Sequence, residues 1–295
     1  MDRTKTIACI LTILLFLTVA ACKKTPPLSV GSKNFTEQVI LGEIIAQHVI
    51  QKLKINVEKK LNMGGTLLVH QSMESGQIDV YPEYTGTGLS SILKLNMTAD
   101  PQGVFDRVRE VYRSSYQMEW LDPLGFDNSF VMAVRRNDSD VQNIATLSDA
   151  ENYQPGWKLG IGYEFESRPD GMPKLNTAYR LPFNGAPATM DLGLLYKALE
   201  QKQVNMIAAN ATDGQLSKDT IKTLTDDRHA FPPYQAALVV RGKALETYPE
   251  LRKVLLQLSG KISAETMRKM NYAVDVEHSQ PAEVAAGFLH SAGLQ

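Results

Sequence analysis

Cysteine is nearly absent from this chain. Its two cysteines, Cys9 and Cys22, both lie within the first 22 of its 295 residues. If Cys9 is removed with this stretch and Cys22 is modified, the rest of the chain can form no disulfide, no cysteine metal site and no cysteine nucleophile. The remaining length suits one large or two medium domains, and a hydrophobic content of 43% supports a substantial core.

A basic excess is also lacking. The formal net charge is −1, and charges of both signs are mixed along the whole sequence. Grooves that bind nucleic acid usually carry an excess of positive charge, so no nucleic-acid partner is expected. Beyond the N-terminal stretch, no segment is long and apolar enough to suggest a membrane-spanning helix.

Enzyme motifs are scarce as well. The histidines show no metal-ligand spacing such as HExxH, so we expect neither a metal nor another cofactor. The sequence has no P-loop and no GxSxG nucleophile elbow. Nothing supplies a nucleophile with a base at hand, and the sequence therefore predicts a protein that is not an enzyme.

The N-terminus carries an export signal. Arg3 and Lys5 precede an apolar run over residues 7–20. That run is too short for a bilayer core of ~30 Å, which takes ~20 helical residues to cross. It fits the hydrophobic part of a signal peptide instead.

The end of that run resembles a bacterial lipobox. Val19-Ala20-Ala21 places small residues before Cys22, which predicts a signal peptide over residues 1–22 and a lipid on Cys22. The alternative is an ordinary signal peptide with an incidental cysteine. Residues 23–27 would form a short tether, and acyl chains add ~0.8 kcal/mol of membrane affinity per buried methylene. We therefore expect a protein of the periplasm or cell envelope, anchored to a membrane by lipid.

Strands and helices alternate in the first part of the remaining chain. Strands are predicted over residues 28–31, 55–57 and 78–81, with helices over residues 35–54 and 66–75. Thr36 is a plausible N-cap for the first of these helices. This order predicts an α/β sheet with mainly parallel pairing.

A second α/β block follows, and the chain then ends in helices. Those helices bring no new sheet, so we expect them to pack on the first block. The predicted organisation is one lobe of residues 28–130 with 235–295 and another of residues 131–234. Two crossovers, near Phe130 and Tyr234, would form a hinge with a cleft between the lobes.

Two aromatic segments have the composition of binding loops. Residues 81–88 follow a predicted strand and combine two tyrosines, a proline and two glycines, although a simple turn would explain them too. Ligands of open α/β sheets bind beyond the carboxyl ends of the strands, where this segment should lie. Residues 231–234 set Tyr234 beside two prolines at the second crossover. Arg168 also follows a strand, though a lone arginine there is usually a surface charge.

These segments together resemble the substrate-binding proteins of ABC transporters for glycine betaine, choline, carnitine and related quaternary amines. The matching segments occur in order along nearly the whole chain. They are residues 31–38, 64–66, 76–87, 124–126, 211–214 and 231–234. The resemblance implies a type II periplasmic-binding-protein fold, a quaternary ammonium ligand, and an ABC permease and ATPase as partners.

The resemblance also implies roles for five residues. Tyr84 and Tyr234 match cage tyrosines, Lys33 and Arg168 match contacts to a ligand carboxylate, and Thr87 matches a polar contact. The chemistry is consistent, because a quaternary ammonium donates no hydrogen bond. It is held by the faces of aromatic rings, at roughly 0.5–2 kcal/mol each. A carboxylate prefers a guanidinium or ammonium partner.

Two positions depart from the family pattern. Phe130 and Asn210 stand where the family often has tyrosine. Phenylalanine keeps the ring face, whereas asparagine replaces the ring with an amide. Such a site would bind a simple betaine more weakly, or would admit a larger, more polar ligand such as a trimethylated amino-acid betaine. A further alternative is a sensor lipoprotein that uses the same fold without transport.

Overall fold

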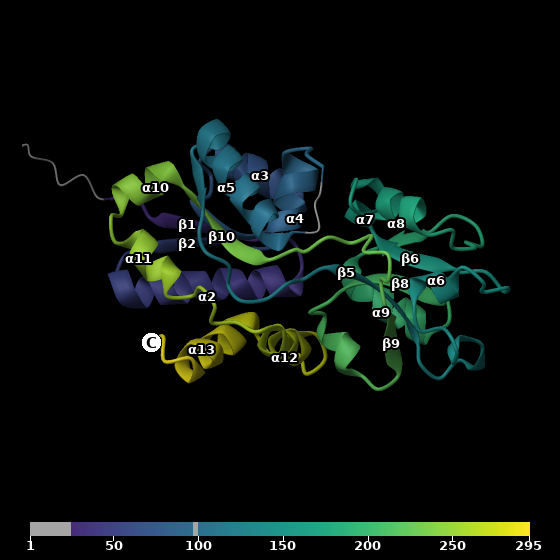
Figure 1. Ribbon diagram of the computed structural model, residues 1–295. Helices are drawn as coiled ribbons and strands as arrows, with labels where there is room; N and C mark the ends of the chain where they lie inside the picture. The colour runs from purple at the N-terminus through teal and green to yellow at the C-terminus, as the bar shows by residue number, and fades with distance from the viewer. Residues whose placement is uncertain (1–24, 97–99) are drawn as a thin grey trace, which may run out of the picture.

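The computed structural model describes residues 25–96 and 100–295 and shows an α/β protein with two mixed sheets, side by side in Figure 1. The predicted signal peptide and Cys22 lie outside the described residues. Among the helices of the described ranges, none combines the length and the apolar character needed to cross a membrane.

The first sheet has the strand order β2-β1-β3-β10-β4. Its strands are β1 (Leu28–Gly31), β2 (Val57–Lys60), β3 (Val80–Tyr84), β4 (Met118–Trp120) and β10 (Ala236–Arg241). Its flanking helices are α2 (Thr36–Leu53), α3 (Thr66–Glu74) and α5 (Pro101–Tyr116). Buried apolar residues of α2 fill one core, and those of α3 and α5 fill another. A short helix, α4 (Thr85–Thr87), and a π-helical turn, Gly88–Ile92, follow β3 directly.

The second sheet has the strand order β7-β6-β8-β5-β9. Its strands are β5 (Phe130–Arg135), β6 (Leu159–Gly162), β7 (Ala188–Met190), β8 (Met206–Asn210) and β9 (Ile221–Leu224). Its helices are α6 (Leu147–Ala150), α7 (Tyr163–Ser167), α8 (Met172–Ala178) and α9 (Leu192–Glu200). Two further apolar cores lie against this sheet.

The prediction of mainly parallel pairing is confirmed for the three strands from which it was made, but each complete sheet is mixed. β1 is parallel to β2 and β3, but β10 is antiparallel to both β3 and β4. Similarly, β5 is antiparallel to β8 and β9, whereas β6 is parallel to β7 and β8. Both antiparallel strands enter their sheet directly from a crossover, without the intervening helix that returns a chain to the parallel direction.

Strand β3 starts and ends later than predicted. It includes Pro82 and ends at Tyr84, because β10 pairs with it as far as Ala236 opposite Tyr84. On its other side β3 meets β1 only at Val80. Beyond that residue β3 has a single ladder partner, so a proline without an N–H is tolerated there.

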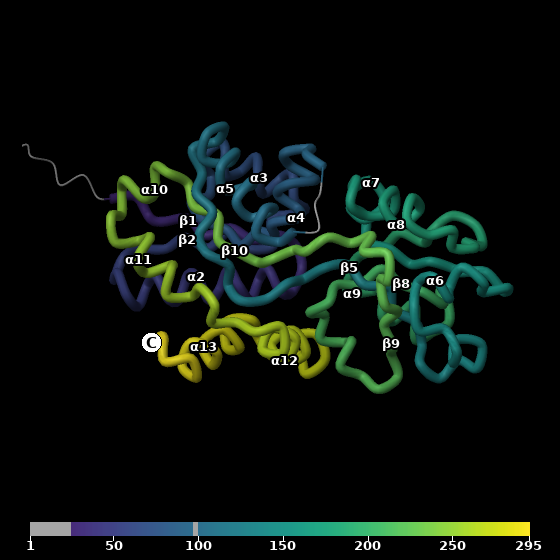
Figure 2. Tube along the Cα trace, viewed as in Figure 1, coloured from purple at the N-terminus to yellow at the C-terminus, as the bar shows by residue number. Residues whose placement is uncertain are grey.

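The chain passes between the sheets twice, and the two passages lie against each other. Asp127 and Gln235 form an antiparallel bridge, and the Asn128 N–H donates to the Tyr234 carbonyl at 3.1 Å. Figure 2 shows both segments running between the halves of the molecule.

The C-terminal helices return to the first sheet. They are α10 (Gly242–Thr247), α11 (Leu251–Leu256), α12 (Ala264–Asp275) and α13 (Pro281–Ser291). α11, α12 and α13 contact α2, and Figure 1 shows the yellow α12 and α13 beside it. The α12 helix also touches the short turn Gly214–Ser217 that follows β8, so it bridges both halves.

Candidate ligand-binding site

One cavity of about 870 Å³ is lined by residues from both sheets. All seven predicted ligand-binding residues line it: Lys33, Tyr84, Thr87, Phe130, Arg168, Asn210 and Tyr234. The topology explains this convergence. Tyr84 and Asn210 are the last residues of β3 and β8, whereas Phe130 begins the antiparallel strand β5 and Tyr234 lies two residues before the antiparallel strand β10. Ends of strands and starts of their antiparallel neighbours meet at the same sheet edge.

Aromatic rings form a connected group at this edge. Phe130 packs edge-on against Phe165 and Tyr234, with ring centroids 4.9 and 5.6 Å apart. Tyr84 stacks with Phe35 at 6.3 Å. Phe35 and Phe165 also line the cavity, and sequence reasoning did not single them out. Phe35 could have been found, because it lies in the segment of residues 31–38 that carries the family resemblance.

Arg168 reaches across the cavity. Its guanidinium carbon lies 5.1 Å from the Phe130 ring centroid and 6.0 Å from that of Tyr234. Its Nη2 donates to Thr87 Oγ1 at 3.0 Å and to Asp170 Oδ2 at 2.6 Å, and its Nε donates to Asp170 Oδ1 at 3.0 Å. Its Nη1 lies 3.7 Å from Glu164 Oε2 and donates no hydrogen bond within the described ranges, so that nitrogen can still donate to a ligand carboxylate.

Asp170 fixes two members of the group at once. Besides its pair with Arg168, its Oδ2 accepts from the Tyr234 hydroxyl at 2.6 Å. Burial works against ionisation of Asp170, but the hydrogen bond and charge of Arg168 outweigh burial and lower its pKa. The sequence offered a signal, because Asp170 lies two residues after a predicted site arginine.

Lys33 is held in a similar way. Its ammonium donates to Glu83 Oε1 at 2.5 Å and lies 5.2 Å from the Tyr84 ring centroid. Glu83 is fully buried, and the same oxygen accepts from the Tyr84 N–H at 2.7 Å. A lysine ammonium has three donors, so this ion pair leaves further donors for a ligand.

The charge balance of the cavity is negative. Glu83 and Asp170 already neutralise its two cations, Lys33 and Arg168. The lining also contains five carboxyl groups, those of Glu37, Glu164, Asp191, Asp213 and Asp275, although burial raises the pKa of Glu37, Asp213 and Asp275. An electronegative cavity with aromatic walls favours a cationic group.

The two departures from the family pattern lie directly opposite each other. Phe130 of β5 pairs with Asn210 of β8, so both side chains lie on the same face of the second sheet. The Asn210 N–H donates to Asp213 Oδ2 at 3.0 Å, and the Tyr196 hydroxyl donates to the same oxygen at 2.9 Å. Burial raises the pKa of Asp213 to about 6. Asp213 Oδ1 accepts no hydrogen bond from the part of the chain that the structure describes.

Glu164 joins the two halves of the molecule beside the cavity. From α7 it accepts from the Thr66 N–H at 2.7 Å and from Thr66 Oγ1 at 3.0 Å, at the N-terminus of α3 in the other half. Gly65 allows this approach, because a Cβ there would lie 2.2 Å from Glu164 Oε1.

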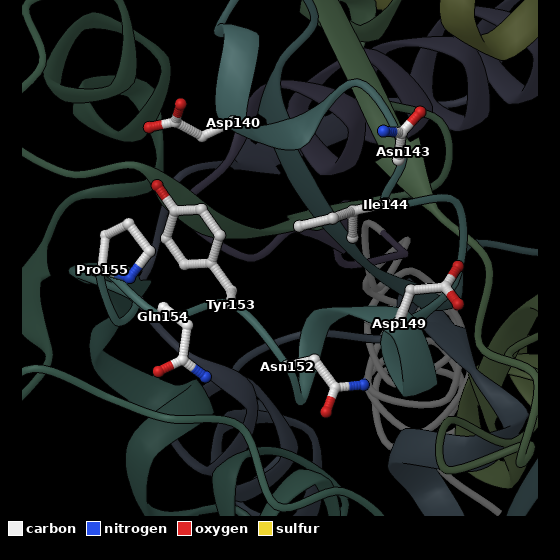
Figure 3. A pocket seen from close by; sticks show the side chains of 8 residues that line it. All are labelled: Asp140, Asn143, Ile144, Asp149, Asn152, Tyr153, Gln154 and Pro155. Atoms are coloured by element: carbon white, nitrogen blue, oxygen red, sulfur yellow. The ribbon is translucent and has the colours of Figure 1, made fainter.

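A second hollow, of about 570 Å³, is lined by side chains from residues 140–155 and is shown in Figure 3. Its polar groups serve the local fold. Tyr153 stacks on Trp157 at 4.0 Å, and Asp149 forms a capping box with Thr146 at the start of α6. Within residues 25–96 and 100–295, no cluster of His, Cys, Asp and Glu is arranged to hold a metal ion.

Known proteins share both the sequence and this architecture. The chain is 35% identical over 269 residues to the ergothioneine transport permease/ergothioneine binding protein EgtU of Helicobacter pylori, covering 91% of this chain but only 48% of that protein. It is 32% identical over 283 residues to a glycine-betaine-binding protein of Pseudomonas aeruginosa, covering 92% and 90% of the two chains.

A solved structure described as a glycine betaine/carnitine/choline ABC transporter superimposes with a TM-score of 0.76 at 26% identity. It covers 90% of this chain and 99% of that one. The predicted two-sheet α/β periplasmic-binding-protein architecture is confirmed by this match. Residues 26–291 match the model for the substrate binding domain of the ABC-type glycine betaine transport system. The chain therefore belongs to this family of substrate-binding domains.

Proposed function

We propose that this chain is the extracytoplasmic binding protein of an ABC importer and holds a quaternary ammonium compound between two lobes. One lobe consists of residues 28–130 with 235–295 and the other of residues 131–234. The observation that carries this proposal is the set of Tyr84, Phe130 and Tyr234 rings around one electronegative cavity. A lipid on Cys22 would hold the protein near its permease and ATPase partners.

The cavity suits both ends of a betaine. Its rings offer faces to the trimethylammonium group, although Arg168 already lies over one face of Phe130 and of Tyr234, and Lys33 over one face of Tyr84. The uncommitted donors of Arg168 and Lys33 suit the carboxylate, and Thr87 adds a polar contact across the cleft. The lobes have to be closed for these groups to act together, because Lys33 and Tyr84 come from one lobe and Arg168 from the other, and the bond from Arg168 to Thr87 already spans the cleft.

A larger trimethylated amino-acid betaine is the second candidate ligand. The cavity lies at the upper end of the ~300–1,000 Å³ typical of small-molecule pockets. Asn210 leaves room where a ring would stand, and Asp213 Oδ1 beside it is a free acceptor for a ligand N–H. Ergothioneine, the solute in the name of the Helicobacter pylori relative, is a betaine of this kind with ring N–H groups.

A ligand screen tests this proposal. The soluble chain starting at Lys23 would be heated with choline, glycine betaine, carnitine or ergothioneine, with glycine and histidine as unmethylated controls. A bound ligand stabilises the folded state by mass action, so the melting temperature should rise for methylated compounds only. Calorimetry should then show stoichiometric binding without turnover. If no quaternary amine shifts the melting temperature, the proposed ligand class is wrong.

A further inference from the structure

Glu37 is a buried carboxylate that receives hydrogen bonds from four separate segments. It is the second residue of α2 and is 3% exposed. Its Oε1 accepts from the Tyr84 hydroxyl at 2.6 Å and from Asn128 Nδ2 at 2.9 Å. Its Oε2 accepts from Thr212 Oγ1 at 2.5 Å and from Asn271 Nδ2 at 3.0 Å. These donors lie on β3, the first crossover, the turn after β8, and α12.

Every polar atom of Thr212 forms a hydrogen bond. Besides the bond to Glu37, its N–H donates to Asn128 Oδ1 at 3.1 Å and its carbonyl accepts from Asn271 Nδ2 at 2.8 Å. It is fully buried. The turn of residues 211–214 follows a strand of the second sheet, yet its middle is fixed to α2, to α12 and to the first crossover.

The neighbours of Thr212 are fixed in the same way. Arg268 Nη2 of α12 donates to the Ala211 carbonyl at 3.1 Å. A Cβ on Gly214 would lie 2.3 Å from the Tyr272 nitrogen, so the α12 backbone lies directly against that glycine. We call residues 211–214 the anchored turn.

The opposite side of the cavity is joined differently. There the halves meet through the single side chains of Arg168 and Glu164, which bond to Thr87 and Thr66. Such contacts can separate without unpacking a core. In a hinged protein the lobes rotate about the contacts that persist, and the anchored turn has the contacts that would persist.

We propose that Glu37 is a positioning residue that fixes the Tyr84 ring to the anchored turn, about which the second lobe rotates. The Tyr84 ring then takes up its ligand-binding position when the lobes close. This inference rests on the proposed function, in which Tyr84 is a cage ring.

The chemistry requires a carboxylate at this position. Both oxygens of a glutamate accept hydrogen bonds, whereas a glutamine would direct an NH₂ group at two of the four donors. Burial raises the pKa of Glu37 in spite of these four bonds, each of which favours the ionised form. Replacement by glutamine can therefore satisfy only one half of the network.

A double-mutant cycle tests the coupling. The affinities for choline and glycine betaine would be measured by calorimetry for Glu37→Gln, Tyr84→Phe and the double variant. Each single change should weaken binding about tenfold, as expected for a lost hydrogen bond to a charged group. The double variant should bind no more weakly than the weaker single variant. Multiplying effects, or an unchanged affinity for Glu37→Gln, would overturn the proposal.

Thr212→Val keeps the proposal testable if Glu37→Gln does not fold. Thr212 is not among the residues that line the cavity, so it can reach the ligand only through the network. Its effect should also fail to add to that of Tyr84→Phe. Glu43→Gln is the control, because Glu43 lies on α2 but pairs with Lys59 outside the cavity, and it should leave affinity unchanged.

A ligand-free measurement separates this proposal from the proposed function. The chain starting at Lys23 has no cysteine, so spin labels at Gln71→Cys and Gln154→Cys would report the distance between the lobes. Glu37→Gln should broaden that distance distribution. An unchanged distribution rejects the pivot role. If no quaternary amine binds the wild type, the proposed function fails. The width of the distance distribution in Glu37→Gln would still decide whether Glu37 fixes the pivot.

Discussion

The two walls of the cavity differ in how closely they follow the family pattern. The wall from the first sheet has Lys33, Tyr84 and Thr87 at the positions that the resemblance implies. The wall from the second sheet places Phe130 opposite Asn210, where the family often has tyrosines. We therefore propose that the first wall holds features common to quaternary amines and that the second wall selects among them.

Removal of Tyr84 should have the largest effect. Tyr84→Ala removes a ring and leaves Glu37 without one of its donors, so choline and glycine betaine should both bind at least about a hundredfold more weakly. Calorimetry would measure both affinities. Tyr84→Phe keeps the ring and should lie between the wild type and the alanine variant. An alanine variant that binds like the wild type would remove Tyr84 from the first wall.

Arg168 should distinguish ligands by their carboxylate. Because Arg168→Ala alone leaves Asp170 buried and unpaired, it would be made in an Asp170→Asn background, with Asp170→Asn alone as the control. Glycine betaine should lose about ten- to a hundredfold in affinity, and choline should lose less. Equal losses for both ligands in a binding titration would show that Arg168 acts only in closure.

Asn210→Tyr should make the second wall resemble the family pattern. An added ring contributes roughly 0.5–2 kcal/mol, so glycine betaine should bind about two- to thirtyfold more tightly. Ergothioneine should lose affinity, because the ring fills the space beside Asp213. Phe130→Tyr serves as the comparison, since it adds a hydroxyl and no ring. If Asn210→Tyr leaves the preference between the two ligands unchanged, this wall does not select.

Lowering the pH should produce the smallest change in ligand affinity. The pKa of Asp213 is about 6 and lies above its ordinary value of 3.8, so its carboxylate is ionised only above about pH 6. Affinity for ergothioneine should fall as the pH drops from about 7 to about 5, because the charged acceptor is lost. Asp213→Asn should flatten this profile in a titration series.

Asp213 should also make the stability of the ligand-free protein depend on pH, with the opposite sign to its effect on ligand affinity. Between the ordinary pKa and about 6 the folded state binds the proton more tightly than the unfolded chain does. The contribution of Asp213 to the free energy of unfolding is therefore largest at low pH and declines as the pH rises through this window. Chemical denaturation of wild type and Asp213→Asn should show this difference.

Local sequence patterns predicted many residues of the site but few of the hydrogen bonds and ion pairs between them. Six of the seven predicted residues lie close to the end or the start of a strand, which short segments reveal, and Arg168 follows α7 directly. Thr36 shows the limit. Its expected role as an N-cap is wrong, since Phe35 occupies the N-cap position, without a side-chain hydrogen bond, and Thr36 Oγ1 donates to Asp275 at 2.5 Å. A contact between residues so distant in sequence overrides the local rule, and no local pattern contains it.

Sequence motifs were enough to identify the family, the two-lobed α/β class and seven of the residues that line the cavity. These depend on motifs and on hydrophobic periodicity, which are local. Only the tertiary structure showed that Phe130 faces Asn210, that Glu83 and Asp170 neutralise the two cations, and that Glu37 joins Tyr84 to Thr212. Those facts depend on strand register and on the burial of polar groups that must find partners, and both are decided by the folded chain as a whole.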